Sequence, residues 1–149
     1  MRTAQKGKII YCIDMMIAYV EIFKPQINYV NVENYVEELH YDSWGEPENN
    51  IFFSPMDVIN DPKKYKEEYK RTMDADLKYP IMIFNNNVID GYHRIAKSII
   101  QKKSKIKAYV FTNEEMKKFI INRTGDYKKV MKMEEHDFIT LFYKRFCDK

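Results

Sequence analysis

The sequence of 149 residues contains few of the residues that build cross-links and turns: two cysteines, four glycines and five prolines. Cys12 and Cys147 lie near opposite ends, and neither belongs to a Cys-x-x-Cys pair or to a cysteine and histidine cluster. This argues against a disulfide framework and against a zinc site. We therefore expect a reduced, intracellular and cytoplasmic setting.

A long apolar run is also missing. Residues 1–23 begin with basic residues and continue with an apolar stretch, as a signal peptide does. However, Asp14 and Glu21 interrupt that stretch, no small-residue cleavage site follows, and it is shorter than the about 20 apolar residues of a membrane span. We expect a buried helix over residues 8–23, ended by Pro25, and no membrane partner.

The sequence has no strong excess of charge of one sign. The net charge is +3 and the isoelectric point is about 8.7, which is too balanced for a protein that coats DNA but leaves weak, non-specific DNA binding open. With 45% hydrophobic and 32% charged residues, the chain has the composition of a soluble globular protein, and its length suggests one domain.

Strand and helix signals alternate along the chain. Strands are predicted at four short apolar runs: 51–53, 79–84, 88–90 and 105–111. Beyond residues 8–23, helices are predicted after Asn31, after Ser54-Pro55, after Asp61-Pro62, over 91–102, after a capping box at Thr112, and over 136–146. This order predicts an α+β fold, a small mixed sheet packed by helices. The expected parts are a helical N-terminal extension (1–49), a core (50–112) and C-terminal helices of the same domain (113–149).

The most informative stretch is Asn85–Lys103, NNNVIDGYHRIAKSIIQKK. If a helix begins after Asp90, the next four residues form its first turn, where backbone N–H groups lack partners and the helix dipole is positive. Gly91 would allow a ligand to approach closely, and His93 and Arg94 would add donors, so the turn suits a phosphate. The same residues also suit a plain helix start with Asp90 as its cap, and local chemistry leaves both interpretations open.

Residues 51–111 resemble the ParB/sulfiredoxin superfamily domain. The segments FFSPMDVINDP, KKYKEEYKRTMDADLKYPIMIF and NNNVIDGYHRIAKSIIQKKSKIKAYVF follow that family's order of strand, polar helix, hairpin, glycine turn with a His-Arg pair, helix and closing strand. The resemblance implies a nucleoside triphosphate, ATP or CTP, bound with Mg²⁺. It implies nucleotide or phosphate contacts for Gly91, Tyr92, His93, Arg94, Lys63, Lys64 and Thr72. Lys97 lies one turn beyond His93 and could either reach the same anion or be solvated.

The resemblance also implies catalytic roles. His93 and Arg94 would neutralise charge during phosphoryl transfer, Asp61 would be the carboxylate base with Asp57 as the second candidate, and Asp90 would help bind the metal. For Asp61 the alternative is a helix cap, because Asp-Pro is a common helix opening.

The chain departs from two branches of that family. Tyr92 occupies the position of the reactive cysteine of sulfiredoxins, and a phenol with a pKa of about 10 does not replace a thiolate, so sulfinic-acid reduction is not expected. The residues after Phe111 are too few and too apolar for the DNA-binding domain of partition proteins. The D-G-x-H-R form is closest to the free-serine kinase branch and to uncharacterised ParB-like proteins, including some from large DNA viruses, which extends the expected location to an infected cell or a virion.

Two functions from different classes follow. The first is a nucleotide-binding protein that uses the DGYHR turn for phosphoryl transfer or hydrolysis; the alternative is a non-catalytic DNA-associated or regulatory module, with a virion structural protein as a third option. Trp44 is expected to pack locally, and scattered tyrosines and lysines leave single-strand binding as a secondary possibility. Phe138, Phe142 and Phe146 recur at helical spacing, which predicts a helix docked on the core or, if exposed, a homodimer surface.

Overall fold

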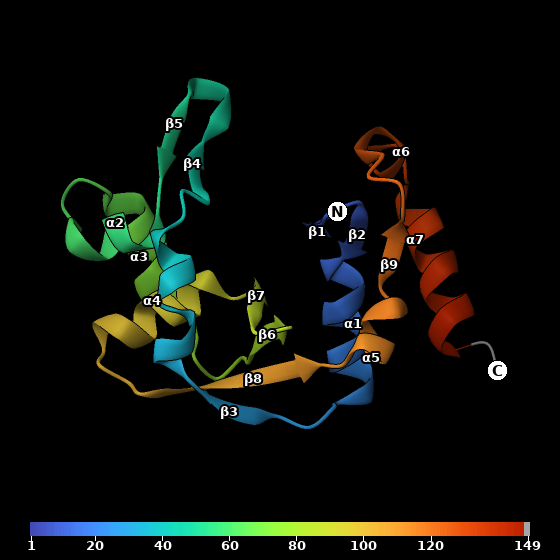
Figure 1. The fold of residues 1–149 in the computed structure, drawn as a ribbon, viewed down its shortest axis with the longest axis horizontal. Coiled ribbons are helices and arrows are strands. Elements are labelled where there is room, and N and C mark those ends of the chain that lie inside the picture. Colours follow the sequence, from blue (N-terminus) through green and yellow to red (C-terminus); the bar gives the residue numbers. More distant parts are fainter. Residues whose placement is uncertain (148–149) are drawn as a thin grey trace. The chain divides into compact units, whose positions relative to one another are not determined.

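The computed structural model describes residues 1–147 and forms two compact units. Unit 1 combines residues 1–25 with 111–149, and unit 2 is the continuous stretch 26–110 (Figure 1). The described residues form small sheets and several helices, which confirms the α+β class. The division into units differs from the boundaries expected after residues 49 and 112, because the first 25 residues pack with the C-terminal segment.

Unit 1 contains a three-stranded antiparallel sheet in the order β1-β2-β9. Its strands are β1 (Thr3–Lys6), β2 (Ile9–Cys12) and β9 (Ile120–Asn122). Its helices are α1 (Ile13–Phe23), α5 (Asn113–Lys117), α6 (Tyr127–Met131) and α7 (Glu135–Phe142), the last followed by a π-helical turn, Tyr143–Cys147. No helix within residues 1–147 has the length and apolar character needed to cross a membrane.

An aromatic cluster forms part of the core of unit 1. Phe119 is fully buried, and its ring centroid lies 5.4 Å from that of Tyr19 and 5.7 Å from that of Phe146. Phe142 is also buried and lies 4.9 Å from Phe146. The predicted docking of the C-terminal aromatic helix on a core is therefore confirmed for Phe142 and Phe146. The homodimer stays a prediction.

Unit 2 contains a four-stranded sheet in the order β3-β8-β6-β7 and a separate two-stranded hairpin, β4-β5. The strands are β3 (Asn28–Asn31), β4 (Trp44–Glu46), β5 (Ile51–Phe53), β6 (Ile81–Phe84), β7 (Asn87–Asp90) and β8 (Lys105–Phe111). The helices are α2 (Pro55–Asn60), α3 (Lys66–Asp74) and α4 (Tyr92–Ile100), with 3₁₀ turns at Val32–Tyr35, Glu37–His40 and Pro47–Asn49.

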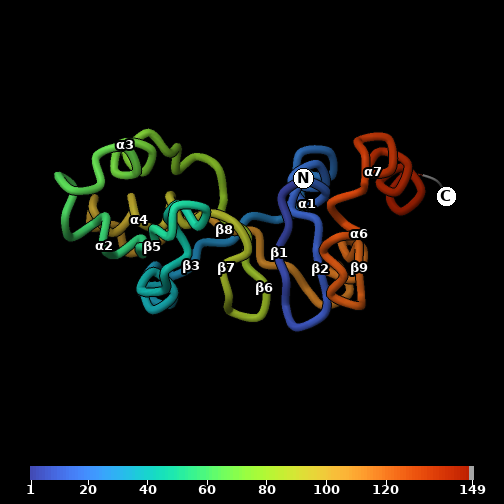
Figure 2. The backbone as a smooth tube through the Cα atoms, turned by 90° about the horizontal axis from the view of Figure 1, so that it is seen from above, coloured from blue at the N-terminus to red at the C-terminus, as the bar shows by residue number. Residues whose placement is uncertain are grey.

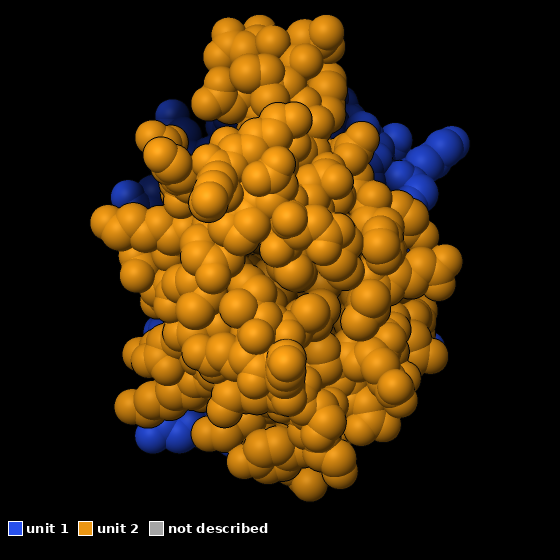
Figure 3. Space-filling view, turned by 90° about the vertical axis from the view of Figure 1, so that its left-hand side faces the viewer, with its two compact units in different colours: residues 1–25, 111–149 blue, residues 26–110 orange. Residues whose placement is uncertain are grey.

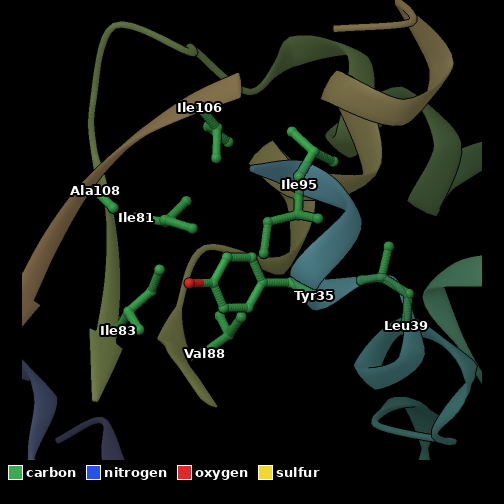
Figure 4. Packing of buried hydrophobic residues seen from close by; sticks show 9 residues of the cluster. Tyr35, Leu39, Ile81, Ile83, Val88, Ile95, Ile106 and Ala108 are labelled. Carbon is green, nitrogen blue, oxygen red and sulfur yellow. The ribbon is translucent and has the colours of Figure 1, made fainter. Parts of the chain in front are cut away.

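One face of the four-stranded sheet carries the core of unit 2 (Figure 4). Alternate residues of the strands point toward α4 and the 3₁₀ turns, as a period of two requires. The buried cluster consists of Val32, Tyr35, Leu39, Ile81, Ile83, Val88, Ile95, Ile106 and Ala108. Helix α4 also contacts α2 and α3, beside which it lies in Figure 2, so the helix is held by the sheet and by two helices.

Several local signals give the predicted structure. Ser54 caps α2 in a capping box with Asp57, and Thr112 does the same for α5 with Glu115. Asn85 and Asn86 adopt positive φ angles of 49° and 59° in the turn between β6 and β7, as their residue type permits. These helix starts and this hairpin are therefore confirmed.

Other predictions are wrong in part. Residues 9–12 form β2 rather than helix, because they pair with β1 and with the distant β9. The segment after Asn31 forms 3₁₀ turns, and the segment after Asp61-Pro62 forms a turn, so that α3 begins only at Lys66. The short helix α6, capped by Asp126, was not predicted.

Candidate functional site

The candidate site is the first turn of α4, where the DGYHR residues lie. Gly91 is the residue before the helix, with φ of 121°, and no side chain caps this helix end. A Cβ atom at Gly91 would lie 2.5 Å from Cγ2 and 2.8 Å from Cβ of Ile81, which is far too close. The glycine is therefore required by its contact with β6, whether or not a ligand also approaches it.

Arg94 fastens this turn to the start of β6. Its guanidinium donates to the carbonyl oxygens of Tyr79 at 3.1 Å and of Pro80 at 2.6 Å, and to Oδ2 of Asp90 at 3.0 Å. The Arg94 and Asp90 side chains are 17% and 23% exposed, so the ion pair is only partly screened. Arg94, predicted to grip phosphate, thus has a structural role, and Asp90 is its partner rather than a helix cap.

His93 is held from two sides. Its Nε2 lies 2.7 Å from Oε1 of Glu68 on α3, and its ring stacks on the indole of Trp44, with centroids 4.4 Å apart and planes 20° apart. The His93 side chain is 38% exposed, and Glu68 is 15% exposed. A carboxylate that accepts from Nε2–H fixes the ring orientation and leaves Nδ1 as the proton acceptor. This is the arrangement of an oriented acid–base histidine.

Tyr92 is partly buried against the core cluster of unit 2. Burial, together with the charges of Glu38 and Tyr41, raises the pKa of Tyr92 to about 12. The phenol therefore stays neutral over the physiological pH range. A neutral phenol is not a nucleophile, and the phosphate contact of Tyr92 stays a prediction.

Two further predicted contacts are occupied by the protein itself. Lys97 donates from Nζ to the carbonyl oxygen of Ala75 at 2.6 Å, just after the end of α3. Thr72 is fully buried, and its hydroxyl donates to the carbonyl oxygen of Glu68 at 2.9 Å. Thr72 therefore cannot reach a bound nucleotide without unfolding of α3, and Lys97 would have to leave its carbonyl partner.

The three remaining predicted residues lie in the turn between α2 and α3. Lys63 and Lys64 are exposed, and Nζ of Lys64 lies 5.3 Å from the ring centroid of Tyr65. Asp61 ends α2, and its Oδ1 accepts from the backbone N–H of Lys64 at 3.3 Å. These two contacts of Asp61 and Lys64 are thus local, and neither links the turn between α2 and α3 to His93.

The residues at the first turn of α4 do not form a metal site by themselves. In the described part of the chain, no group of three or more His, Cys, Asp or Glu side chains is placed to hold a metal ion. The predicted ligand Asp90 already pairs with Arg94. Mg²⁺ commonly binds one or two carboxylates and the phosphates of a substrate, so the role of Asp90 stays a prediction that depends on a nucleotide.

Sequence reasoning missed Glu68 and underestimated Trp44. Glu68 lies in a polar helix rich in acidic and basic residues, where nothing in the local pattern distinguishes it from Glu67. Trp44 carries a usable signal as the only tryptophan, but the β4-β5 hairpin that brings it to His93 is not apparent from the polar segment around it. The β4-β5 hairpin forms the projection at the top of Figure 3.

Comparison with models of known protein families found no match, and comparisons with curated proteins and with solved structures found none either.

Proposed function

We propose that unit 2 binds a phosphate-bearing nucleotide at the first turn of α4. The observation that carries this proposal is the start of the helix: its N-cap residue is Gly91, which has no side chain to accept from the first N–H groups, and the partly exposed His93 lies at the same turn. Unsatisfied amides and a positive helix end favour anions, and phosphate groups are the usual ligands at such ends. The element order from β5 to β8 is also the order expected of a ParB/sulfiredoxin-like domain.

The proposed chemistry is phosphoryl transfer or hydrolysis with His93 as the acid–base residue. Glu68 holds the imidazole at 2.7 Å, so Nδ1 can accept a proton from an attacking hydroxyl or water. Arg94 would hold the first turn of α4 in position, because it joins this helix to the backbone that precedes β6. The nucleotide would carry its Mg²⁺ with it.

Calorimetry with ATP, CTP, GTP and ADP tests binding directly, and the fluorescence of Trp44 provides a second reading because the indole stacks on His93. We expect at least one nucleotide to bind and, at about 100 times its Kd, to add roughly 2.7 kcal/mol to the free energy of unfolding. We expect His93→Ala to weaken binding about tenfold through the loss of one ligand contact.

The matched control is His136→Ala, which removes an exposed histidine of unit 1 and should leave binding unchanged. Arg94→Ala is a poor test, because the loss of its carbonyl bonds would destabilise the unliganded protein as well. His93→Gln separates binding from chemistry: it can still donate to Glu68 but offers no ring nitrogen as base. Absence of binding by all four nucleotides would refute the proposal.

The DNA-associated alternative uses the same helix start on a DNA phosphate and stays a prediction. It loses support because Arg94, the strongest cation at the turn, donates to protein carbonyl groups and to Asp90. Salt-dependent duplex binding that disappears in His93→Ala, without nucleotide binding by the wild type, would favour it.

A further inference from the structure

A second surface of unit 2 is unused by the candidate site. Four lysines lie within the seven residues that follow α4: Lys102, Lys103, Lys105 and Lys107. Across the described chain, none of them forms an ion pair with a carboxylate, and three are exposed while Lys107 is partly so. Four adjacent unpaired cations repel one another, and a polyanionic ligand would relieve this repulsion.

The strand β8 places two of these lysines on the side of the sheet that faces away from the core. Ile106 and Ala108 point into the core cluster (Figure 4), so Lys105, Lys107 and Tyr109 alternate onto the opposite face. On that side the surface is therefore basic with an aromatic ring at one end.

The neighbouring edge strand β3 adds a second aromatic ring to the same face. In the antiparallel register, Tyr29 lies opposite Lys107 and Asn31 lies opposite Lys105. Directly opposite side chains of two paired strands are close neighbours on one face. Tyr29 is 65% exposed, so its ring is accessible to a ligand.

A depression of about 400 Å³ continues this strip beyond the start of β8. The depression is lined by the polar residues Lys102, Lys103, Ser104 and Asn31, by one acidic residue, Glu33, and by the apolar residues Val32, Val36 and Ile99. The strip thus runs from a basic depression, past Lys105 and Asn31, to Tyr29, Lys107 and Tyr109.

We propose that this face of β3 and β8, with the depression beside it, binds single-stranded nucleic acid. Exposed rings on a sheet provide stacking platforms for unpaired bases, and lysines that alternate with them neutralise the phosphates between the bases. A duplex buries its bases and would meet only the lysines, so Tyr29 would have no role in duplex binding. The proposal is independent of a nucleotide site at α4.

The test uses the full-length protein and fluorescein-labelled oligo-dT and oligo-U of about 12 nucleotides, with a duplex of the same length, at increasing salt. We expect the single strands to bind more tightly than the duplex. Tyr29→Ala should weaken binding about tenfold, and Tyr29→Phe should keep it, because stacking needs the ring and not the hydroxyl. Lys105→Gln/Lys107→Gln should reduce the slope of log K against log salt by about 1.4, or about 0.7 for each phosphate contact.

Matched controls lie in unit 1. Tyr143→Ala removes a ring that is 60% exposed, and Lys128→Gln/Lys129→Gln removes two adjacent exposed lysines; neither should change the affinity. Tyr29 is a surface residue, and unchanged thermal unfolding would show that its variants fold. The proposal is overturned if no single strand binds at about 50 mM salt, if the duplex binds equally well, or if Tyr29→Ala keeps full affinity. Single-strand binding that is lost in His93→Ala and kept in Tyr29→Ala would move the binding to α4 and would also overturn it.

Discussion

Gly91 combines a positive φ angle with the closest approach between α4 and β6. Its φ of 121° disfavours any side chain, and a Cβ would overlap Ile81. We expect Gly91→Ala to lower the free energy of unfolding by about 3 kcal/mol, from backbone strain and from displacement of Ile81 together. Chemical denaturation followed by circular dichroism measures this.

Gly7→Ala is the matched control. Gly7 also has a positive φ, 59°, but nothing lies within 4 Å of an added Cβ, so only the left-handed backbone is penalised, by about 1 kcal/mol. Equal losses for the two variants would show that the contact with Ile81 contributes nothing.

The raised pKa of Tyr92 predicts that the protein loses stability at alkaline pH. Its pKa is raised to about 12 in the folded state, against about 10 for an ordinary tyrosine, so the folded state holds the phenol proton more tightly than the unfolded state does. This contribution to stability is complete below pH of about 10 and is lost as the pH rises toward about 12. It amounts to at most about 3 kcal/mol.

Tyr92→Phe should therefore show a smaller loss of stability than the wild type between pH of about 10 and about 12, as measured by urea unfolding at each pH. Tyr143→Phe, at an exposed position, should follow the wild type. Parallel curves for wild type and Tyr92→Phe would contradict the assignment.

At the scale of elements, the β4-β5 hairpin and α4 meet through one aromatic contact, the stack of Trp44 on His93. A stack of this kind is worth about 0.5–1.5 kcal/mol beyond simple burial. We expect a double-mutant cycle with Trp44→Leu and His93→Ala to give a coupling energy in that range, measured by thermal unfolding. A cycle that pairs Trp44→Leu with His136→Ala should be additive. An additive cycle for Trp44 and His93 would show that their stack does not contribute to stability.

Elements with strong local signals were predictable, and elements made by distant partners were not. The Ser54 and Thr112 caps and the Asn85-Asn86 turn carry their own side-chain chemistry, so α2, α5 and the β6-β7 hairpin follow from the sequence. β2 has the apolar spacing of a helix and becomes a strand because β1 and the distant β9 pair with it. Likewise, the DGYHR turn was predictable as a helix start, but the partners that occupy Arg94 and His93 come from segments 14 and 25 residues away.

At the scale of the whole molecule, each unit has its own reporter. Trp44 is the only tryptophan and lies in unit 2, whereas the buried Cys12 lies in unit 1. Burial also raises the pKa of the Cys12 thiol, so it should react with a thiol reagent only when unit 1 opens, while the exposed Cys147 reacts at once.

We expect two denaturant midpoints, one from Trp44 fluorescence and one from Cys12 reactivity, because each unit has its own sheet and its own buried residues. Cys147→Ser simplifies the measurement by removing the fast thiol. Coincident midpoints would mean that the two units unfold as one.

The pairing of β2 with β9 joins Ile10 to Asn122 and Tyr11 to Ile120. The sheet of unit 1 therefore combines residues that precede unit 2 in the sequence with residues that follow it. During synthesis, β2 leaves the ribosome early and has no β9 to pair with until the whole of unit 2 has been made. Unit 2, a continuous stretch, can fold as soon as it emerges. The apolar strand Ile9–Cys12 thus lacks its β9 partner while unit 2 is synthesised, and this interval is when the nascent chain would most need a chaperone.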